Sequence, residues 1–170
     1  MEPTSTPSQN GIVKAMVGMA KWFLPSEPDS LEDPAFRALA ALVPGVSFIL
    51  ELSPEGAWAL AWVSQRSREV FGLEPEELAG PAERWLEFVK IEDREALTDA
   101  LAWAGSKGEE WRWVGRMTLP DRMMWIQGAA TFVPSSKATK RWVGVWFEMP
   151  DPAALEAGRK AQEERRVLSL

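Results

Sequence analysis

Residues 122–134, which read RMMWIQGAATFVP, decide how the rest of this sequence is interpreted. The run is mostly apolar, it contains aromatic and β-branched residues, and it ends at a proline, so it predicts a β-strand. Because successive side chains of a strand point to opposite faces, Met124, Ile126, Gly128 and Ala130 share one face. That face lacks bulk at its centre. The missing volume must be filled either by a large side chain from a neighbouring strand or by a ligand.

The composition excludes several kinds of site. The 170 residues include no cysteine and no histidine, so the chain has no disulfide, no thiol nucleophile and no histidine base or metal ligand. A net charge of −6 disfavours binding to nucleic acid. No nucleophile stands near a base, and acidic pairs such as 92–93 and 109–110 are typical of helix N-termini or solvated surface. We expect a protein without enzyme activity and without a metal site.

The expected location is the cytoplasm of a bacterial cell. The residues before the first apolar run, MEPTSTPSQN, contain no basic side chain, whereas a secretory signal begins with a positive segment. No run reaches the roughly 18–20 apolar residues that a membrane-spanning helix needs.

The order of the expected elements predicts an α+β fold. Two strands come first, then several short helices, one longer helix and three further strands. The strands are expected at 46–52, 58–64, 109–118, 122–133 and 140–149, and the longer helix at 91–105 with Gly105 as its end. This order predicts a mostly antiparallel sheet of about five strands with short helices on one face.

Helices are also expected on both sides of this domain. Residues 1–43 divide into a disordered tail, an apolar helix over 11–24, an acidic linker and a short helix over 35–42. The domain itself covers 44–150. Residues 151–170 form a C-terminal helix, with Asp151 as the N-cap.

Four segments resemble motifs of the PAS domain family, the sensor modules of bacterial signalling proteins. They are WVSQRSREVFGLEPEEL (62–78), WLEFVKIEDREALTDAL (85–101), RMMWIQGAATF (122–132) and RWVGVWFEMPD (141–151). The chain departs from the family pattern where Lys90 replaces a common histidine. It also departs where Glu148-Met149-Pro150 replaces the usual Asp-Ile-Thr ending, and where Asp121-Arg122 replaces an Asp-Gly turn.

The resemblance implies a cupped sheet with a small pocket inside, an outer face covered by a flanking helix or a second copy, and a C-terminal helix that relays a signal. The implied pocket residues are Met124, Ile126, Gly128, Ala130, Trp142 and Trp146, with Arg116 as a basic group for a carboxylate ligand. The implied outer interface comprises Ile12, Met16, Met19, Phe23, Trp113, Trp125, Val145 and Phe147, and the relay comprises Glu148 and Asp151.

Two structural alternatives stay open at this point. Trp142 and Trp146 either line a pocket or fill the space beside Gly128 and Ala130 themselves. The helix over 11–24 either covers the outer face of its own chain or joins a homodimer; a role at a membrane surface is less favoured, because it carries only two lysines.

The missing residue types also limit the cofactor. Histidine-ligated haem, a cysteine–flavin adduct and a cysteine-linked chromophore are excluded, whereas a noncovalent flavin stays compatible, since tryptophan can stack on its ring. We therefore expect a non-enzymatic sensor or dimerisation module that acts on an effector such as a histidine kinase or a diguanylate cyclase. The alternatives are an adaptor that binds a partner protein without a ligand, and a small-molecule carrier.

Overall fold

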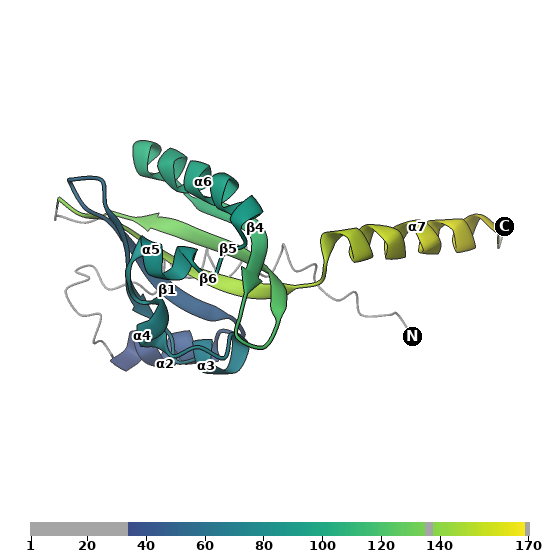
Figure 1. The fold of residues 1–170 in the computed structure, drawn as a ribbon, viewed down its shortest axis with the longest axis horizontal. Coiled ribbons are helices and arrows are strands. Elements are labelled where there is room, and N and C mark those ends of the chain that lie inside the picture. Colours follow the sequence, from purple (N-terminus) through teal and green to yellow (C-terminus); the bar gives the residue numbers. More distant parts are fainter. Residues whose placement is uncertain (1–33, 135–137, 169–170) are drawn as a thin grey trace.

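A curled antiparallel sheet forms the centre of the structure, a computed structural model that describes residues 34–134 and 138–168 (Figure 1). The sheet has six strands in the order β3-β2-β1-β6-β5-β4. They are β1 (Val46–Leu52), β2 (Trp58–Val63), β3 (Gly80–Pro81), β4 (Trp111–Thr118), β5 (Met123–Val133) and β6 (Lys140–Met149). The five expected strands are confirmed, and the two-residue strand β3 adds a sixth. The last strand, β6, lies between β1 and β5 in the middle of the sheet.

Helices cover parts of both faces of the sheet, and the last helix extends away from it (Figure 1). They are α2 (Pro34–Leu42), α3 (Ser67–Val70), α4 (Pro75–Leu78), α5 (Ala82–Leu86), the 3-10 turn η1 (Ile91–Asp93), α6 (Arg94–Lys107) and α7 (Pro152–Leu168). Side chains of α3 to α6 pack into the main core on one face, which we call the inner face. Phe36 of α2 packs with Ile49 and Val143 on the opposite, outer face. The α+β class with flanking helices is thus confirmed. Residues 1–33, with the expected tail and first helix, lie outside the described residues.

The longer helix does not end where the sequence suggested. Gly105 was expected to end it, but α6 continues to Lys107. Gly105 instead lies inside the helix, where it allows close packing against β1 and β2. A Cβ at this position would come within 2.9 Å of Leu52 Cδ2 and 3.0 Å of Trp58 Cζ2. The helix ends at Gly108, whose φ of 65° is left-handed and whose N–H donates to the Ala104 carbonyl at 2.8 Å.

Short segments from the middle of the chain pair with parts of β2 and β4, the outermost long strands of the sheet. On one side, β3 pairs with Ala59 and Leu60 of β2. On the other side, the residues just before η1 run along β4. The Lys90 N–H donates to the Arg116 carbonyl at 2.9 Å, and the Thr118 N–H donates to the Phe88 carbonyl at 2.7 Å.

Candidate functional site

The inner face of the sheet is filled by tryptophan. Trp85, Trp111, Trp142 and Trp146 are among the largest fully buried side chains of the described residues. A Cβ at Gly128 would lie 2.8 Å from both Trp111 Cη2 and Trp146 Cδ1, so the two rings occupy the volume that the glycine leaves. Trp146 lies opposite Gly128 in the pairing of β5 and β6. In this structure the gap at the centre of β5 is therefore occupied by indole rings.

Trp146 connects the sheet to the helices that cover it. Its ring stacks on Phe48 of β1, with centroids 4.1 Å apart and an interplanar angle of 29°. Its centroid lies 5.7 Å from that of Trp85 in α5 and 6.1 Å from that of Phe71, which follows α3. Nearer the start of β6, the ring centroid of Trp142 lies 5.0 Å from that of Trp58. The predicted pocket residues Met124, Ile126, Ala130, Trp142 and Trp146 all belong to this main core.

These indole rings differ in their hydrogen bonding. Trp142 Nε1 donates to the Glu109 carbonyl at 2.7 Å. Among the described residues, five buried side-chain atoms have no hydrogen-bond partner: Ser67 Oγ and Nε1 of Trp85, Trp111, Trp113 and Trp146. A buried polar group without a partner costs about 1–3 kcal/mol. In this core Trp142 thus has a backbone acceptor, whereas these five atoms have no partner among the protein groups. The sequence contains ten tryptophans and no tyrosine, but it does not indicate which indole N–H groups have a partner.

The prediction that Trp113 of β4 lies on the outer face was wrong. Trp113 belongs, with Trp111, to the main core of the inner face. The strand alternates strictly, with Trp111, Trp113, Gly115 and Met117 buried. Gly115 makes this possible, because a Cβ at that position would collide with the ring of Trp113.

Arg116 was wrongly placed in the pocket, since the same alternation puts it on the other face of β4. Its Nε and Nη2 donate to Asp93 Oδ2 and Oδ1, both at 2.7 Å, and its backbone N–H donates to Oδ2 at 2.8 Å. Its Cζ also lies 5.1 Å from the centroid of the Trp125 ring. Arg116 lowers the pKa of the Asp93 carboxyl below its ordinary value. The pair therefore joins η1 and β4 as a structural cross-link.

The predicted outer-face residues are only partly described. Ile12, Met16, Met19 and Phe23 lie outside the described residues. Trp125 and Phe147 are partly buried, Val145 is buried, and Phe147 packs against Ala129, which is 0% exposed. The sheet thus has a second apolar surface opposite the tryptophan core.

The two predicted relay residues lie at the end of β6 and the start of α7. Glu148 Oε2 is 3.9 Å from Arg122 Nη2, and the same nitrogen donates to the carbonyl of Val70, the last residue of α3, at 2.9 Å. Asp151 Oδ1 accepts from the Ala153 N–H at 2.8 Å and caps α7. The end of β6 is thereby connected both to the helix layer and to the C-terminal helix.

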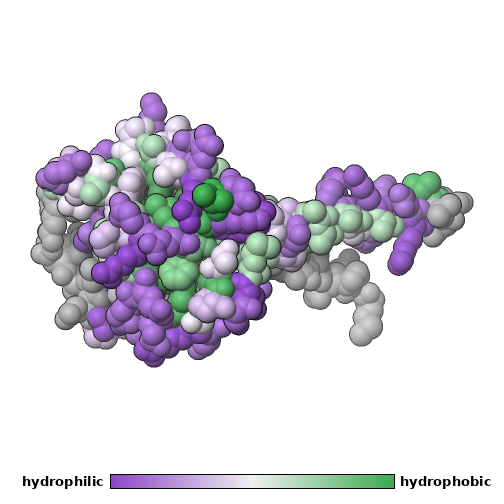
Figure 2. Space-filling model, viewed as in Figure 1, coloured by the Kyte–Doolittle hydropathy of each residue, from purple (hydrophilic) through white to green (hydrophobic). Residues whose placement is uncertain are grey.

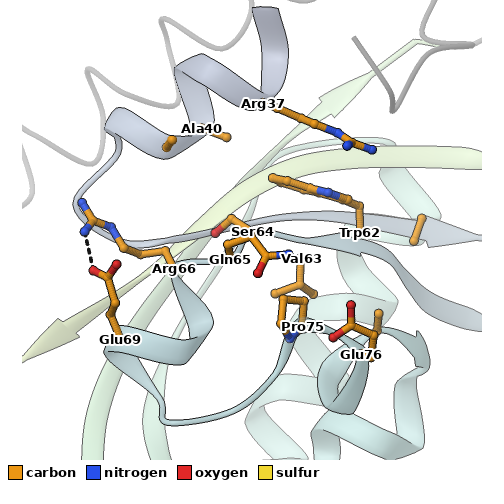
Figure 3. Close-up of a pocket in the computed structure, with 13 residues that line it drawn as sticks. Arg37, Ala40, Trp62, Val63, Ser64, Gln65, Arg66, Glu69, Pro75 and Glu76 are labelled. Carbon is orange, nitrogen blue, oxygen red and sulfur yellow. Dashed lines mark hydrogen bonds and ion pairs between the residues drawn. The ribbon is translucent and has the colours of Figure 1, made fainter. Parts of the chain in front are cut away.

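A pocket of about 450 Å³ lies elsewhere, between α2, β2, α3 and α4 (Figure 3). Arg37, Ala40 and Trp62 line one part of it, and Pro75 and Glu76 line another. None of the predicted pocket residues is among its lining residues. Arg66 and Glu69, which also line it, form an ion pair at 2.6 Å, so the lining carries both charges and favours neither sign of ligand.

The described residues place limits on cofactors and on membrane insertion. They contain no group of three or more acidic side chains that could hold a metal ion, and no helix among them is both long and apolar enough to cross a bilayer. The space over Gly128 is filled by the rings of Trp111 and Trp146.

Residues 60–146, half of the chain, match the family model described as the PAS fold. The chain therefore belongs to the PAS fold family, whose members are in general sensory modules of signalling proteins without catalytic activity. No curated protein sequence matches it significantly.

Solved structures with low sequence identity share this fold. A light-oxygen-voltage domain with a flavin analogue is 15% identical with a TM-score of 0.56, and the match covers 78% of this chain and 97% of that one. A PAS domain from Colwellia psychrerythraea is 18% identical with a TM-score of 0.51, covering 67% and 94%. The N-terminal domain of a diguanylate cyclase with a PAS/PAC sensor from Marinobacter aquaeolei is 14% identical with a TM-score of 0.50, covering 60% and 94%.

The packing over Gly128 leads to a test by mutation. We expect Gly128→Ala to lower the free energy of unfolding by about 1–3 kcal/mol, because the added methyl must push two indole rings aside. The atoms of Trp111 nearest to the added methyl, Cη2 and Cζ3, are absent from phenylalanine. The double variant Gly128→Ala/Trp111→Phe should therefore lose less stability than the two single variants together. Urea unfolding would measure all three, and strict additivity would contradict this packing.

The ion pair of Asp93 with Arg116 predicts a pH dependence. Asp93→Asn should lower the free energy of unfolding at pH 7 by about 1–2 kcal/mol, because a charge-assisted pair is lost. Since the folded-state pKa of Asp93 is lowered, this stabilisation is present above the ordinary carboxyl value of 3.8 and is lost as the pH falls through the lowered pKa. The difference between wild type and variant should shrink below about pH 4.

A matched control is Glu110→Gln, which removes an exposed ion pair with Arg112 and should change stability little. A constant difference between wild type and Asp93→Asn from pH 7 to pH 3 would show that the carboxylate charge does not stabilise the fold.

Proposed function

We propose that the chain is a non-enzymatic sensor and dimerisation module of a cytoplasmic bacterial signalling protein. In this proposal a change in the tryptophan core passes along β6 into α7 and from there to an effector. The observation that carries the proposal is the continuity of β6 with α7, because one strand holds the core and leads to the exposed helix.

The geometry of β6 supports this route. The strand carries Trp142 and Trp146 on its inner face and pairs with both β1 and β5. Only Pro150 and Asp151 separate its last residue, Met149, from the first residue of α7. A shift of either indole ring therefore acts on a strand that ends within a few residues of the helix.

The exposure of α7 supports an effector beyond it. The helix extends away from the sheet, and its side chains from Ala153 to Val167 are all exposed (Figure 1). Figure 2 shows a pale green, weakly apolar strip along the helix between purple, hydrophilic residues. An isolated helix of this length is marginally stable in water, so we infer that α7 packs against a partner helix or an adjoining domain.

The outer face supports a homodimer. Trp125 and Phe147 present partly exposed apolar rings, and the sequence of residues 11–24 offers an apolar row of Ile12, Met16, Met19 and Phe23. In our proposal this segment and the outer face meet within a dimer. The proposed effector is a histidine kinase or a diguanylate cyclase. One structure with the same fold is the N-terminal domain of a diguanylate cyclase.

A second candidate function is an adaptor that binds a partner protein and no ligand. It is favoured by the core itself, because the rings of Trp111 and Trp146 already occupy the space over Gly128. In that case the signal would enter through the outer face.

The dimer is tested by sedimentation of the full chain. At micromolar concentration we expect about twice the 19.0 kDa mass of the monomer. Deletion of residues 1–25 should return it to the monomer, whereas the exposed substitution Trp103→Gln in α6 should leave the dimer intact. A full-length monomer, unchanged by the deletion, would overturn this part of the proposal.

The relay is tested in the same dimer. Because the chain has no cysteine, Ala161→Cys places a single spin label on α7. We expect Trp146→Phe to change the distance between the two labels, since it alters the core beneath β6. Trp103→Phe is the matched control, because this tryptophan is 52% exposed on α6. An identical distance distribution in the labelled Ala161→Cys protein and in its Trp146→Phe and Trp103→Phe variants would show that the core and α7 are not coupled.

A further inference from the structure

The pocket between α2, β2, α3 and α4 lies at the edge of the sheet, apart from the tryptophan core (Figure 3). At this edge, β3 pairs with β2 only at Ala59 and Leu60, and the pocket lies beside the next residues of β2. It is bordered by α2, which packs on the outer face, and by α3 and α4, which pack on the inner face. None of the fully buried tryptophans lines it, so a ligand in this pocket leaves the core packing unchanged.

The walls of the pocket are held in place by contacts within the protein. The ring of Trp62 packs edge to face on Phe36 of α2, with centroids 5.2 Å apart. At another part of the lining, Arg66 Nη1 donates to Glu69 Oε2 at 2.6 Å, and Arg66 Nε donates to the carbonyl of Val43, which follows α2, at 3.4 Å. A pocket that is already formed needs little free energy to be organised on binding.

Glu76 supplies a negative charge on the α4 side of the pocket. The two other glutamates of this helix start are engaged in its capping box, in which the Glu74 N–H donates to Glu77 Oε2 at 2.7 Å. The Glu76 carboxylate has no hydrogen-bond or ion-pair partner among the described residues. Its helix is fixed at the other end, because Arg84 Nη1 donates to the carbonyl of Ala79 at 3.0 Å. A carboxylate is thus available on a fixed wall.

Arg37 supplies a positive charge on the opposite side. In Figure 3, Trp62 and Val63 of β2 lie between Arg37 on α2 and Glu76 on α4. The whole lining contains two arginines and two glutamates, so its formal charge is zero. The two charges that face each other across β2 therefore favour a ligand with one positive and one negative end over an ion of either sign.

The rest of the lining indicates what lies between the two ends of the ligand. The ring of Trp62 and the alanines at 40, 41, 61 and 79 provide apolar surface. Gln65 also lines the pocket, and its side-chain amide has no hydrogen-bond partner among the described residues. A primary amide both donates and accepts, which matches the N–H and C=O of a peptide bond.

We propose that this pocket binds a short zwitterionic peptide of about two residues, with its ammonium group at Glu76, its carboxylate at Arg37 and an apolar side chain against Trp62. The proposal depends neither on the sensor route through β6 nor on the dimer. Because α2 and α4 belong to opposite faces of the sheet, the bound peptide joins two helices that the sheet edge separates. Amide hydrogen exchange in α2 should therefore slow when the peptide binds.

The test uses the full chain and four probes built on one dipeptide. They are alanyl-leucine, its N-acetyl form without the ammonium group, its amide without the carboxylate, and the form with both caps. The indole N–H signal of Trp62 in a proton–nitrogen NMR spectrum, assigned with Trp62→Phe, reports binding. We expect alanyl-leucine to move this signal in a saturable manner and to leave the indole signal of Trp142 in place. Each single cap should weaken binding by about 2- to 5-fold, the loss expected for one exposed ion pair.

Variants assign each end of the peptide to its wall. Glu76→Gln should weaken binding of alanyl-leucine by about 2- to 5-fold and leave binding of the N-acetyl form unchanged, because that form has no ammonium group to lose. Arg37→Gln should likewise weaken alanyl-leucine and leave its amide unchanged. Both side chains are exposed, so the fold should tolerate either change. The matched control is Glu95→Gln, an exposed glutamate in the first turn of α6 that does not line the pocket.

Three results would overturn the inference. Equally tight binding of the doubly capped form would show that the pocket takes an internal segment of a protein chain and not a free peptide. If Glu76→Gln weakened the free and the N-acetylated peptide alike, Glu76 would not be the partner of the ammonium group. If no probe at millimolar concentration moved the Trp62 signal, the pocket would not be a site for short peptides. The spin labels on α7 judge the sensor proposal separately from all three.

Discussion

The packing of Trp146 against Gly128 is the contact on which the other parts of this structure depend. Gly128 lies opposite Trp146 in the sheet and has no side chain, so the indole lies directly over the strand. From there the ring reaches Phe48 on β1 and Trp85 on α5. One side chain thus sets the distance between the sheet and the helices that cover it.

The same core shows that volume and polarity are separate requirements. The volume requirement is met, because neighbouring side chains fill the space over the glycines: Trp111 and Trp146 over Gly128, and Ala130 and Phe48 over Gly144. A hydrogen-bond partner for the indole N–H is present among the protein groups at Trp142 but not at Trp146. Tryptophan thus fills the volume that the glycine leaves and also brings an N–H group into the core.

The order of strands and helices was predictable from hydrophobic periodicity and turn residues, and so was the inner face of β5 and β6. Which residues of β4 face the core was not predictable, because nothing in the sequence fixes the length of the turn before Trp111. That one uncertainty misplaced both Trp113 and Arg116. The pairing of Arg116 with Asp93 joins residues 23 positions apart, and only the folded chain brings them together.

The end of α6 was also predicted wrongly from the local sequence, because tertiary contacts determine where this helix ends. Gly105 has the features of a helix end, but it is needed inside α6 for close approach to Leu52 and Trp58. The left-handed backbone is found instead at Gly108. The two-residue strand β3 was too short for periodicity to detect. The unpartnered indoles could not be anticipated, because a hydrogen-bond partner is a property of the packed core rather than of the sequence.

The paired edges of the sheet limit how copies of this protein can associate. Strands with free edges can join end to end into open-ended assemblies. Here the Phe88–Lys90 segment is hydrogen-bonded along β4, and β3 lies along β2. A second copy therefore cannot add a strand at these two segments without displacing them. The pairing directs self-association away from these stretches and toward the faces of the sheet.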